Sequence, residues 1–214
     1  MWLSCAASLD AQPCAAADRP TASLCSAVGR PLSFGVRRDD RELQRVNIQA
    51  TSILGGAVVG VGATLVQDLW NLFLKRAFGI PSLDVCLLGR WLCHMPAGTF
   101  KHVSIRAAPP KTRECAVGAI AHYTIGAVFA LLLVLLTSGD WLLRPTLLPA
   151  LLVAIVTLVF PFFLMQPALG LGVASSRAPN PTRARLKSLM SHVAFGLGLY
   201  LCALPVSYVL RARS

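Results

Sequence analysis

The stretch Ala119–Leu136, which reads AIAHYTIGAVFALLLVLL, decides the fold of this chain of 214 residues. It contains no Asp, Glu, Lys or Arg. A helix of about 20 such residues crosses the hydrocarbon core of a bilayer. Only 14% of the whole chain is charged and its mean hydropathy is +0.63, whereas about 25% of the residues of a soluble domain are charged. The composition therefore predicts an integral membrane protein.

Three further apolar stretches resemble this one in length. Together they predict transmembrane spans at about 48–69, 116–137, 146–167 and 190–210. All four are continuously apolar, whereas the strands of a membrane β-barrel alternate in polarity. The sequence therefore predicts an all-α, polytopic membrane protein, in which four transmembrane helices form two tandem helical hairpins within residues 47–214.

Residues 1–46 differ in composition from the rest of the chain, with three cysteines, many alanines and charges of both signs. They contain no continuous apolar core of a secretory signal. Two interpretations remain, a disordered extension or an overlong start that precedes a true start near Val46.

The seven cysteines are odd in number, and their spacing matches no known framework, so we expect no disulfide scaffold and no cofactor. They stand at positions 5, 14, 25, 86, 93, 115 and 202.

Basic residues indicate the orientation in the membrane. The connectors 70–115 and 168–189 carry seven and four Lys or Arg residues, and the opposite side of the domain carries three. Because Lys and Arg favour the cytoplasm, we expect both connectors to be cytoplasmic and the C-terminus to lie outside, in a bacterial inner membrane. Six arginines in residues 1–46 weaken this contrast.

Asp68 is the acid within a long apolar run, Ile48–Leu74. An ionisable group in a span is costly and by default indicates a functional site with a partner. A hydrated carboxylate at the membrane edge, near Lys75 and Arg76, is the alternative.

Two histidines are candidate partners of Asp68. The second and fourth spans share a pattern in which a small residue, a His and a Gly follow one another at intervals of four residues. The residues are Gly118, His122 and Gly126 in one span, and Ser188, His192 and Gly196 in the other. In the predicted topology Asp68, His122, His192 and Gln166 all fall in the cytoplasmic half of the membrane. We expect them to form a polar cluster for binding or proton relay, unless each His only bonds a facing carbonyl across helices.

Metal binding is poorly supported. Two His and one carboxylate suit a divalent transition metal, but Cys93, His94 and His102 in the first connector match no standard zinc spacing. We therefore predict no metal, with these three residues as weak candidates. The segment around Trp91 suits an interfacial helix or a plug over the polar cluster.

Small residues and positive charge indicate the partners. Gly56 and Gly60 form a small-xxx-small motif that favours close helix contact, and we expect a homodimer through this face. The net charge of +11 is better explained by anionic lipid headgroups than by nucleic acid.

Several short motifs between Asn47 and Pro205 resemble a family of uncharacterised bacterial integral membrane proteins, domain of unknown function 2938. The motifs are Ile53-Leu54-Gly55-Gly56, Gln67-Asp68-Leu69-Trp70, Gly89-Arg90-Trp91, Gly118-x-x-x-His122-Tyr123, Met165-Gln166-Pro167-Ala168-Leu169-Gly170, Pro179-Asn180-Pro181 and His192-x-x-Phe195-Gly196. The resemblance implies a four-span inner-membrane protein and adds no mechanism.

Three functions follow as hypotheses. The leading one is movement of a proton, an ion or a small solute through the Asp/His cluster. The second is a membrane-face enzyme that acts on a lipid-linked or metal-assisted substrate. The third is a non-catalytic assembly partner, in which the polar groups only fix helix packing.

Overall fold

The computed structural model describes residues 36–80 and 84–213, and every regular element in these ranges is a helix. The predicted extension 1–46 lies largely outside the described residues, and helix α1 begins at Val36. The contacts divide the chain into residues 1–44 and 45–214. The fold is described below for the second unit, which contains all four predicted spans.

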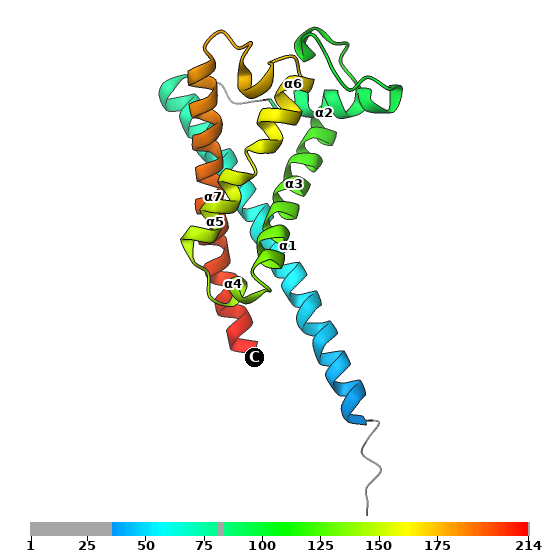
Figure 1. Ribbon diagram of the computed structural model, residues 1–214, viewed down its shortest axis with the longest axis vertical. Helices are drawn as coiled ribbons and strands as arrows, with labels where there is room; N and C mark the ends of the chain where they lie inside the picture. The colour runs from blue at the N-terminus through cyan, green and yellow to red at the C-terminus, as the bar shows by residue number, and fades with distance from the viewer. Residues whose placement is uncertain (1–35, 81–83, 214) are drawn as a thin grey trace, which may run out of the picture. The chain divides into compact units, whose positions relative to one another are not determined.

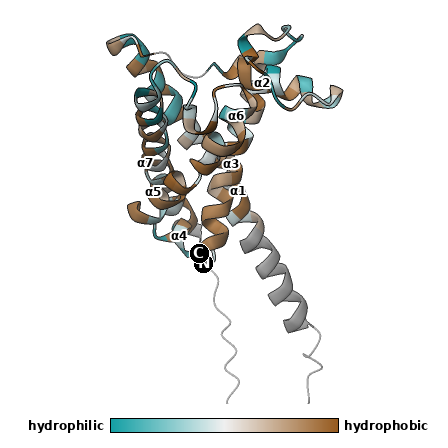
Figure 2. Ribbon diagram, turned by 45° about the horizontal axis from the view of Figure 1, so that its top comes forward, coloured by the Kyte–Doolittle hydropathy of each residue, from teal (hydrophilic) through white to brown (hydrophobic). Residues whose placement is uncertain are grey.

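Four helices are long and apolar enough to cross a membrane, so the predicted all-α, four-span architecture is confirmed. Helix α1 covers Val36–Phe78 and helix α3 covers Glu114–Leu136. Helix α7 covers Pro181–Arg213, and the third span runs from Leu147 to Ala168. Figure 2 shows apolar residues along α3 and α5 (Leu147–Val156), and polar residues gathered at the end that carries α2 (Val85–His94).

Two helices extend beyond their predicted spans at the connector end. Helix α1 continues past residue 69 to Phe78, and helix α7 begins at Pro181 rather than near 190. The spans were bounded where the run of apolar residues ends. The helices continue beyond that point into the charged segments. Asn180 caps α7, since its Oδ1 atom accepts a hydrogen bond of 3.0 Å from the Arg183 amide.

The third span is interrupted. It consists of α5 (Leu147–Val156), a turn at Thr157 and Leu158, the π-helical segment η3 (Pro161–Met165) and α6 (Gln166–Ala168). Pro161 has no amide hydrogen to donate to the preceding turn. The Gln166 amide instead donates to the carbonyl of Pro161, five residues back. Such π-type turns are frequent at functional sites.

Helix α1 packs between α3 and α7 through residues that have little or no side chain. A Cβ atom built on Gly60 would lie 2.5 Å from the Cα atom of Ala127 in α3. On a neighbouring face of α1, a Cβ atom on Gly198 of α7 would lie 2.9 Å from the Cα atom of Ala63. Small residues allow this close approach, which is the usual way that helices associate in lipid.

The remaining elements complete two hairpins, α1–α3 and α5–α7. Gly196 of α7 packs on α5, where its built Cβ would lie 3.0 Å from the Cβ of Ala154. Helix α4 (Asp140–Leu143) turns the chain at the end of the bundle opposite α2 (Figure 1). At the connector end, the amides of His102 and Ile105 donate to the carbonyls of Ala168 and Leu169 at 2.8 and 3.1 Å. The first connector is thereby tied to the end of the third span.

Candidate functional site

Asp68 of α1 pairs with two neighbouring side chains of α3. The Nε2 atom of His122 lies 3.0 Å from Oδ1 of Asp68, and the Tyr123 hydroxyl donates to Oδ2 at 3.1 Å. The side chains of Asp68 and His122 are 36% and 24% exposed. Each oxygen of the carboxylate therefore has its own partner on α3. The Asp68 side chain is partly exposed and paired.

The close approach of α1 and α3 places these groups together. Thr64 and Gly126 stand one turn deeper than Asp68 and His122, and a Cβ atom on Gly126 would meet the Thr64 hydroxyl at 1.9 Å. The Thr64 hydroxyl donates 2.9 Å to the carbonyl of Gly60 within its own helix. The two backbones touch at this point, so the side chains one turn above them are close enough to bond.

The other two predicted members lie in a second polar group between the third and fourth spans. Ser175 donates 2.9 Å to Oε1 of the buried Gln166, whose Nε2 atom lies 3.5 Å from the Ser188 hydroxyl. The Nδ1 atom of His192 lies 2.9 Å from the Ser188 carbonyl in its own helix. Ser188 is therefore the residue that His192 and Gln166 share, and His192 makes no direct bond to Asp68.

Asn71 and Ser191 form a third contact, between α1 and α7. The Ser191 hydroxyl of α7 donates to Oδ1 of Asn71, which follows Asp68 by three residues on α1. Ser191 directly precedes His192. We define the polar belt as the side chains of these three neighbouring groups, which α1, α3, α7, the end of the third span and the connector after it contribute. Its members are Asp68, Asn71, His122, Tyr123, Gln166, Ser175, Ser188, Ser191 and His192.

Sequence reasoning missed five of these residues. Tyr123 directly follows His122, and Asn71 stands one helical turn after Asp68, so proximity to a predicted member was the available signal. Ser188 and Ser191 had the same signal, because they precede His192 by four residues and by one, whereas Ser175 lies in a connector and had none.

The weak metal candidates form a pair of histidines without a third ligand. The rings of His94 and His102 lie 5.1 Å apart, edge to face. The Nε2 atom of His94 lies 3.1 Å from the carbonyl of Pro109, and Cys93 is a free, partly exposed thiol. Over the side chains that the structure describes, no group of three or more His, Cys, Asp or Glu residues is placed to hold a metal ion. Burial and the neighbouring His94 lower the pKa of His102.

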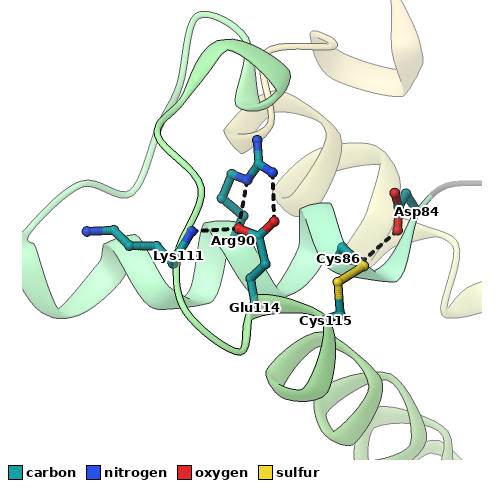
Figure 3. Close-up of a disulfide and its surroundings, with 6 residues drawn as sticks. All are labelled: Asp84, Cys86, Arg90, Lys111, Glu114 and Cys115. Carbon is teal, nitrogen blue, oxygen red and sulfur yellow. Dashed lines mark hydrogen bonds and ion pairs between the residues drawn. A yellow bond between two sulfur atoms is a disulfide. The ribbon is translucent and has the colours of Figure 1, made fainter.

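A disulfide bond joins Cys86 to Cys115, which corrects the expectation drawn from the cysteine count (Figure 3). The expectation rested on the odd number and the spacing of all seven cysteines. The bond depends instead on where two of them meet in the fold. Helix α2 (Val85–His94) crosses the first turn of α3, and a Cβ atom on Gly89 would lie 1.7 Å from the Glu114 carbonyl. The two cysteines sit at this crossing.

An ion pair fixes the same crossing. Arg90 donates to both carboxylate oxygens of Glu114, at 2.7 and 2.9 Å, and also to the Ala108 carbonyl at 3.2 Å. The bonds to Glu114 raise the pKa of the Arg90 guanidinium, so the pair stays ionised. Leu87, Leu88 and Trp91 of α2 are buried. Helix α2 is thus a docked part of the fold.

Gly56 and Gly60, the residues predicted for a homodimer, contact α3 within one chain, and the homodimer stays a prediction. A Cβ atom on Gly56 would lie 3.0 Å from the Leu131 side chain of α3, and Gly60 contacts the backbone of the same helix.

Comparison with known proteins identifies the family. The model of the family described as "Protein of unknown function (DUF2938)" matches residues 57–206, which is well over half of the chain and includes the whole polar belt. No curated protein and no solved structure matches the chain. The match agrees with the resemblance seen in the sequence motifs. The chain belongs to the DUF2938 family of proteins of unknown function.

Proposed function

We propose that this protein moves a proton, or an ion or small solute coupled to a proton, through the polar belt of its four-helix domain. Asp68, His122 and Tyr123 are the exchange site in this proposal. The observation that carries it is the bond between the Asp68 carboxylate and the His122 imidazole, made between two spans in the half of the membrane nearest the connectors.

The chemistry of these groups supports proton exchange. A carboxylate within a span is costly unless it is paired, and such residues commonly mark proton relays and ion pathways. Imidazole ordinarily exchanges its proton near neutral pH. When Asp68 is ionised, His122 and Tyr123 donate to it. When Asp68 takes up a proton, it can donate to the Nε2 atom of a neutral His122, so either protonation state keeps a hydrogen bond.

The rest of the belt provides further polar groups at the same end. Asn71 and Ser191 contact each other between α1 and α7, one turn along α1 from Asp68, and Gln166 lies at the end of the interrupted third span. Interrupted membrane helices commonly border transport sites, because their freed backbone groups can bind a substrate. The proposal assigns the belt, rather than Asp68 alone, to the moving proton or solute.

The orientation predicted from charge remains part of the proposal. Connectors 70–115 and 168–189 would then face the cytoplasm of a bacterial inner membrane, and the belt would open toward the cytoplasm. A homodimer is also part of it, since four spans are few for a transporter.

The test measures proton movement into liposomes that contain the purified full-length chain and a trapped pH-sensitive dye. Asp68→Asn and His122→Gln should lower the flux, because the amides resemble the native groups in size but cannot exchange a proton in the same way. Asp140→Asn is the matched control, since Asp140 is exposed at the other end of the bundle. If the native chain and the three variants show the same flux, above that of empty liposomes, protons do not pass through the polar belt.

A further inference from the structure

We propose that a groove between α2 and α3 binds one acyl chain of an anionic phospholipid, whose phosphate contacts Arg113 and Lys111. The groove has a volume of about 470 Å³. Leu88 and Trp91 line it from α2, and Val117, Ile120 and Ala121 line it from α3. This inference is independent of the proposed function, because it concerns a different face of α3.

The groove is preformed, which favours a specific ligand over transient contacts. Helix α2 is held across the first turn of α3 by the contact at Gly89, by the Arg90–Glu114 ion pair and by the disulfide bond. The first two of these contacts do not depend on the oxidation state of the cysteines. The two walls therefore keep their separation without a ligand between them.

The groove and the exchange site use opposite faces of α3. Val117, Ile120, Ala121 and Thr124 recur at the spacing of one helical face, and Ile120 is 70% exposed. His122 and Gly126 lie on the face that α1 covers. Since α3 is a membrane span, the exposed face meets lipid, and an apolar groove on it suits a hydrocarbon chain.

The upper end of the groove is positively charged. The Val117 amide donates 3.0 Å to the Arg113 carbonyl, so Arg113 stands one turn above the groove, and both Arg113 and Lys111 are exposed. The neighbouring acid, Glu114, is already paired with Arg90 and accepts the Lys111 backbone amide at 2.8 Å. In Figure 3 the Lys111 side chain extends away from Glu114. The two cations are thus placed to meet a phosphate group at the membrane surface.

Charge and apolar surface together select the ligand. A neutral hydrocarbon would need only the groove, and a free phosphate ion would need only the two cations. An anionic phospholipid uses both, because a Lys or Arg near the membrane surface attracts anionic lipid. We therefore expect phosphatidylglycerol to be retained in preference to phosphatidylcholine with the same acyl chains.

The experiment is native mass spectrometry of the full-length protein in detergent, titrated with each lipid or with inorganic phosphate. The native chain should hold one phosphatidylglycerol on the order of tenfold more tightly than phosphatidylcholine. Lys111→Gln with Arg113→Gln should remove that preference, and Ala121→Phe should weaken both lipids by filling the groove. Arg144→Gln and Ile155→Phe, at exposed positions elsewhere, are the matched controls and should change neither.

Each other outcome would overturn the assignment. Equal retention of the two lipids would show that Lys111 and Arg113 do not bind the headgroup. An unchanged lipid affinity in Ala121→Phe would show that the acyl chain does not lie in the groove. Binding of inorganic phosphate alone, with no gain from an acyl chain, would identify an anion site instead. The double variant at Lys111 and Arg113 changes only exposed side chains, so it keeps the test decisive even if Ala121→Phe does not fold.

Discussion

The Nε2 atom of His122 lies 3.0 Å from Oδ1 of Asp68, across the contact between α1 and α3 and 54 residues apart in the sequence. The neighbouring Tyr123 bonds the other oxygen of the same carboxylate. These two bonds make the carboxylate a shared acceptor between two spans. The proposed proton exchange depends on this pair of bonds.

Tyr123→Phe should weaken the exchange site without abolishing it. The variant removes the hydroxyl that donates to Oδ2 of Asp68 and leaves the His122 bond intact. A hydrogen bond to a charged group contributes about 1.5–3 kcal/mol, so we expect about a tenfold loss of proton flux in liposomes. Tyr208→Phe, at a position 73% exposed on α7, is the matched control. A loss as complete as that of Asp68→Asn would assign Tyr123 a larger role.

Gly60→Ala should destabilise the domain. The added Cβ would lie 2.5 Å from the backbone of Ala127 and 2.5 Å from the Gly126 carbonyl, so α1 and α3 would have to move apart. Overpacking of this kind typically costs about 1–3 kcal/mol, which should appear as a lower thermal midpoint in detergent.

Gly55→Ala is the matched control for this contact. Its Cβ would meet only side-chain atoms, at 3.0 Å from Leu142 and 3.3 Å from Val206, which can adjust. We expect a smaller loss than for Gly60→Ala. An equal thermal midpoint for the two variants would contradict the close backbone contact between α1 and α3.

His102 should make stability depend on pH. Burial, with the charge of His94, lowers the pKa of His102 from its ordinary value of 6.5 in the folded protein. The unfolded chain therefore binds the proton more readily, and unfolding is favoured as the pH falls below about 6.5. Stability should be constant above that pH. The thermal midpoint of His102→Gln should fall less between pH 8 and 5 than that of the native chain, with His94→Gln as a comparison. Parallel curves for His102→Gln and the native chain would refute this assignment.

The Cys86–Cys115 bond provides a test of orientation. Cytoplasmic thiol pools hold most cysteine pairs reduced, whereas disulfide bonds persist outside the cytoplasm. The charge-based orientation therefore predicts that the pair is reduced in growing cells and forms when isolated membranes are oxidised. The measurement is a gel shift with a polymer-linked maleimide after acid quenching, on a chain whose other five cysteines are serine. A pair that is oxidised in growing cells and opened by a membrane-impermeant reductant would place connector 70–115 outside.

The sequence predicted the spans because a bilayer imposes a length and a polarity that can be read residue by residue. It also predicted that Asp68 and His122 share a depth, since both lie near the connector end of their spans. The ends of α1 and α7 differed because polar residues continue a helix into water. The sequence thus predicts how deep in the membrane a residue of a span lies. It does not predict how far the helix continues beyond the membrane.

Rotation about the helix axis explains why His192 was not brought to Asp68. The repeat placed His122 and His192 on equivalent helix faces, but the partners of those faces differ. Gly126 packs on α1, whereas Gly196, one turn from His192, packs on α5. Near His192, the residue of α7 that contacts α1 is Ser191, through Asn71. The disulfide bond was missed for a similar reason, because it depends on where α2 docks.

Proton flux through liposomes that contain Asp68→Asn tests the central claim most directly. General acid–base groups typically contribute a factor of about 100 or more to proton transfer. We therefore predict that Asp68→Asn lowers the dye-reported flux by on the order of 100-fold, while Asp140→Asn retains the native rate and both proteins keep a native thermal midpoint. A native flux in Asp68→Asn, or a flux that falls only in proportion to the amount of unfolded protein, would contradict the account.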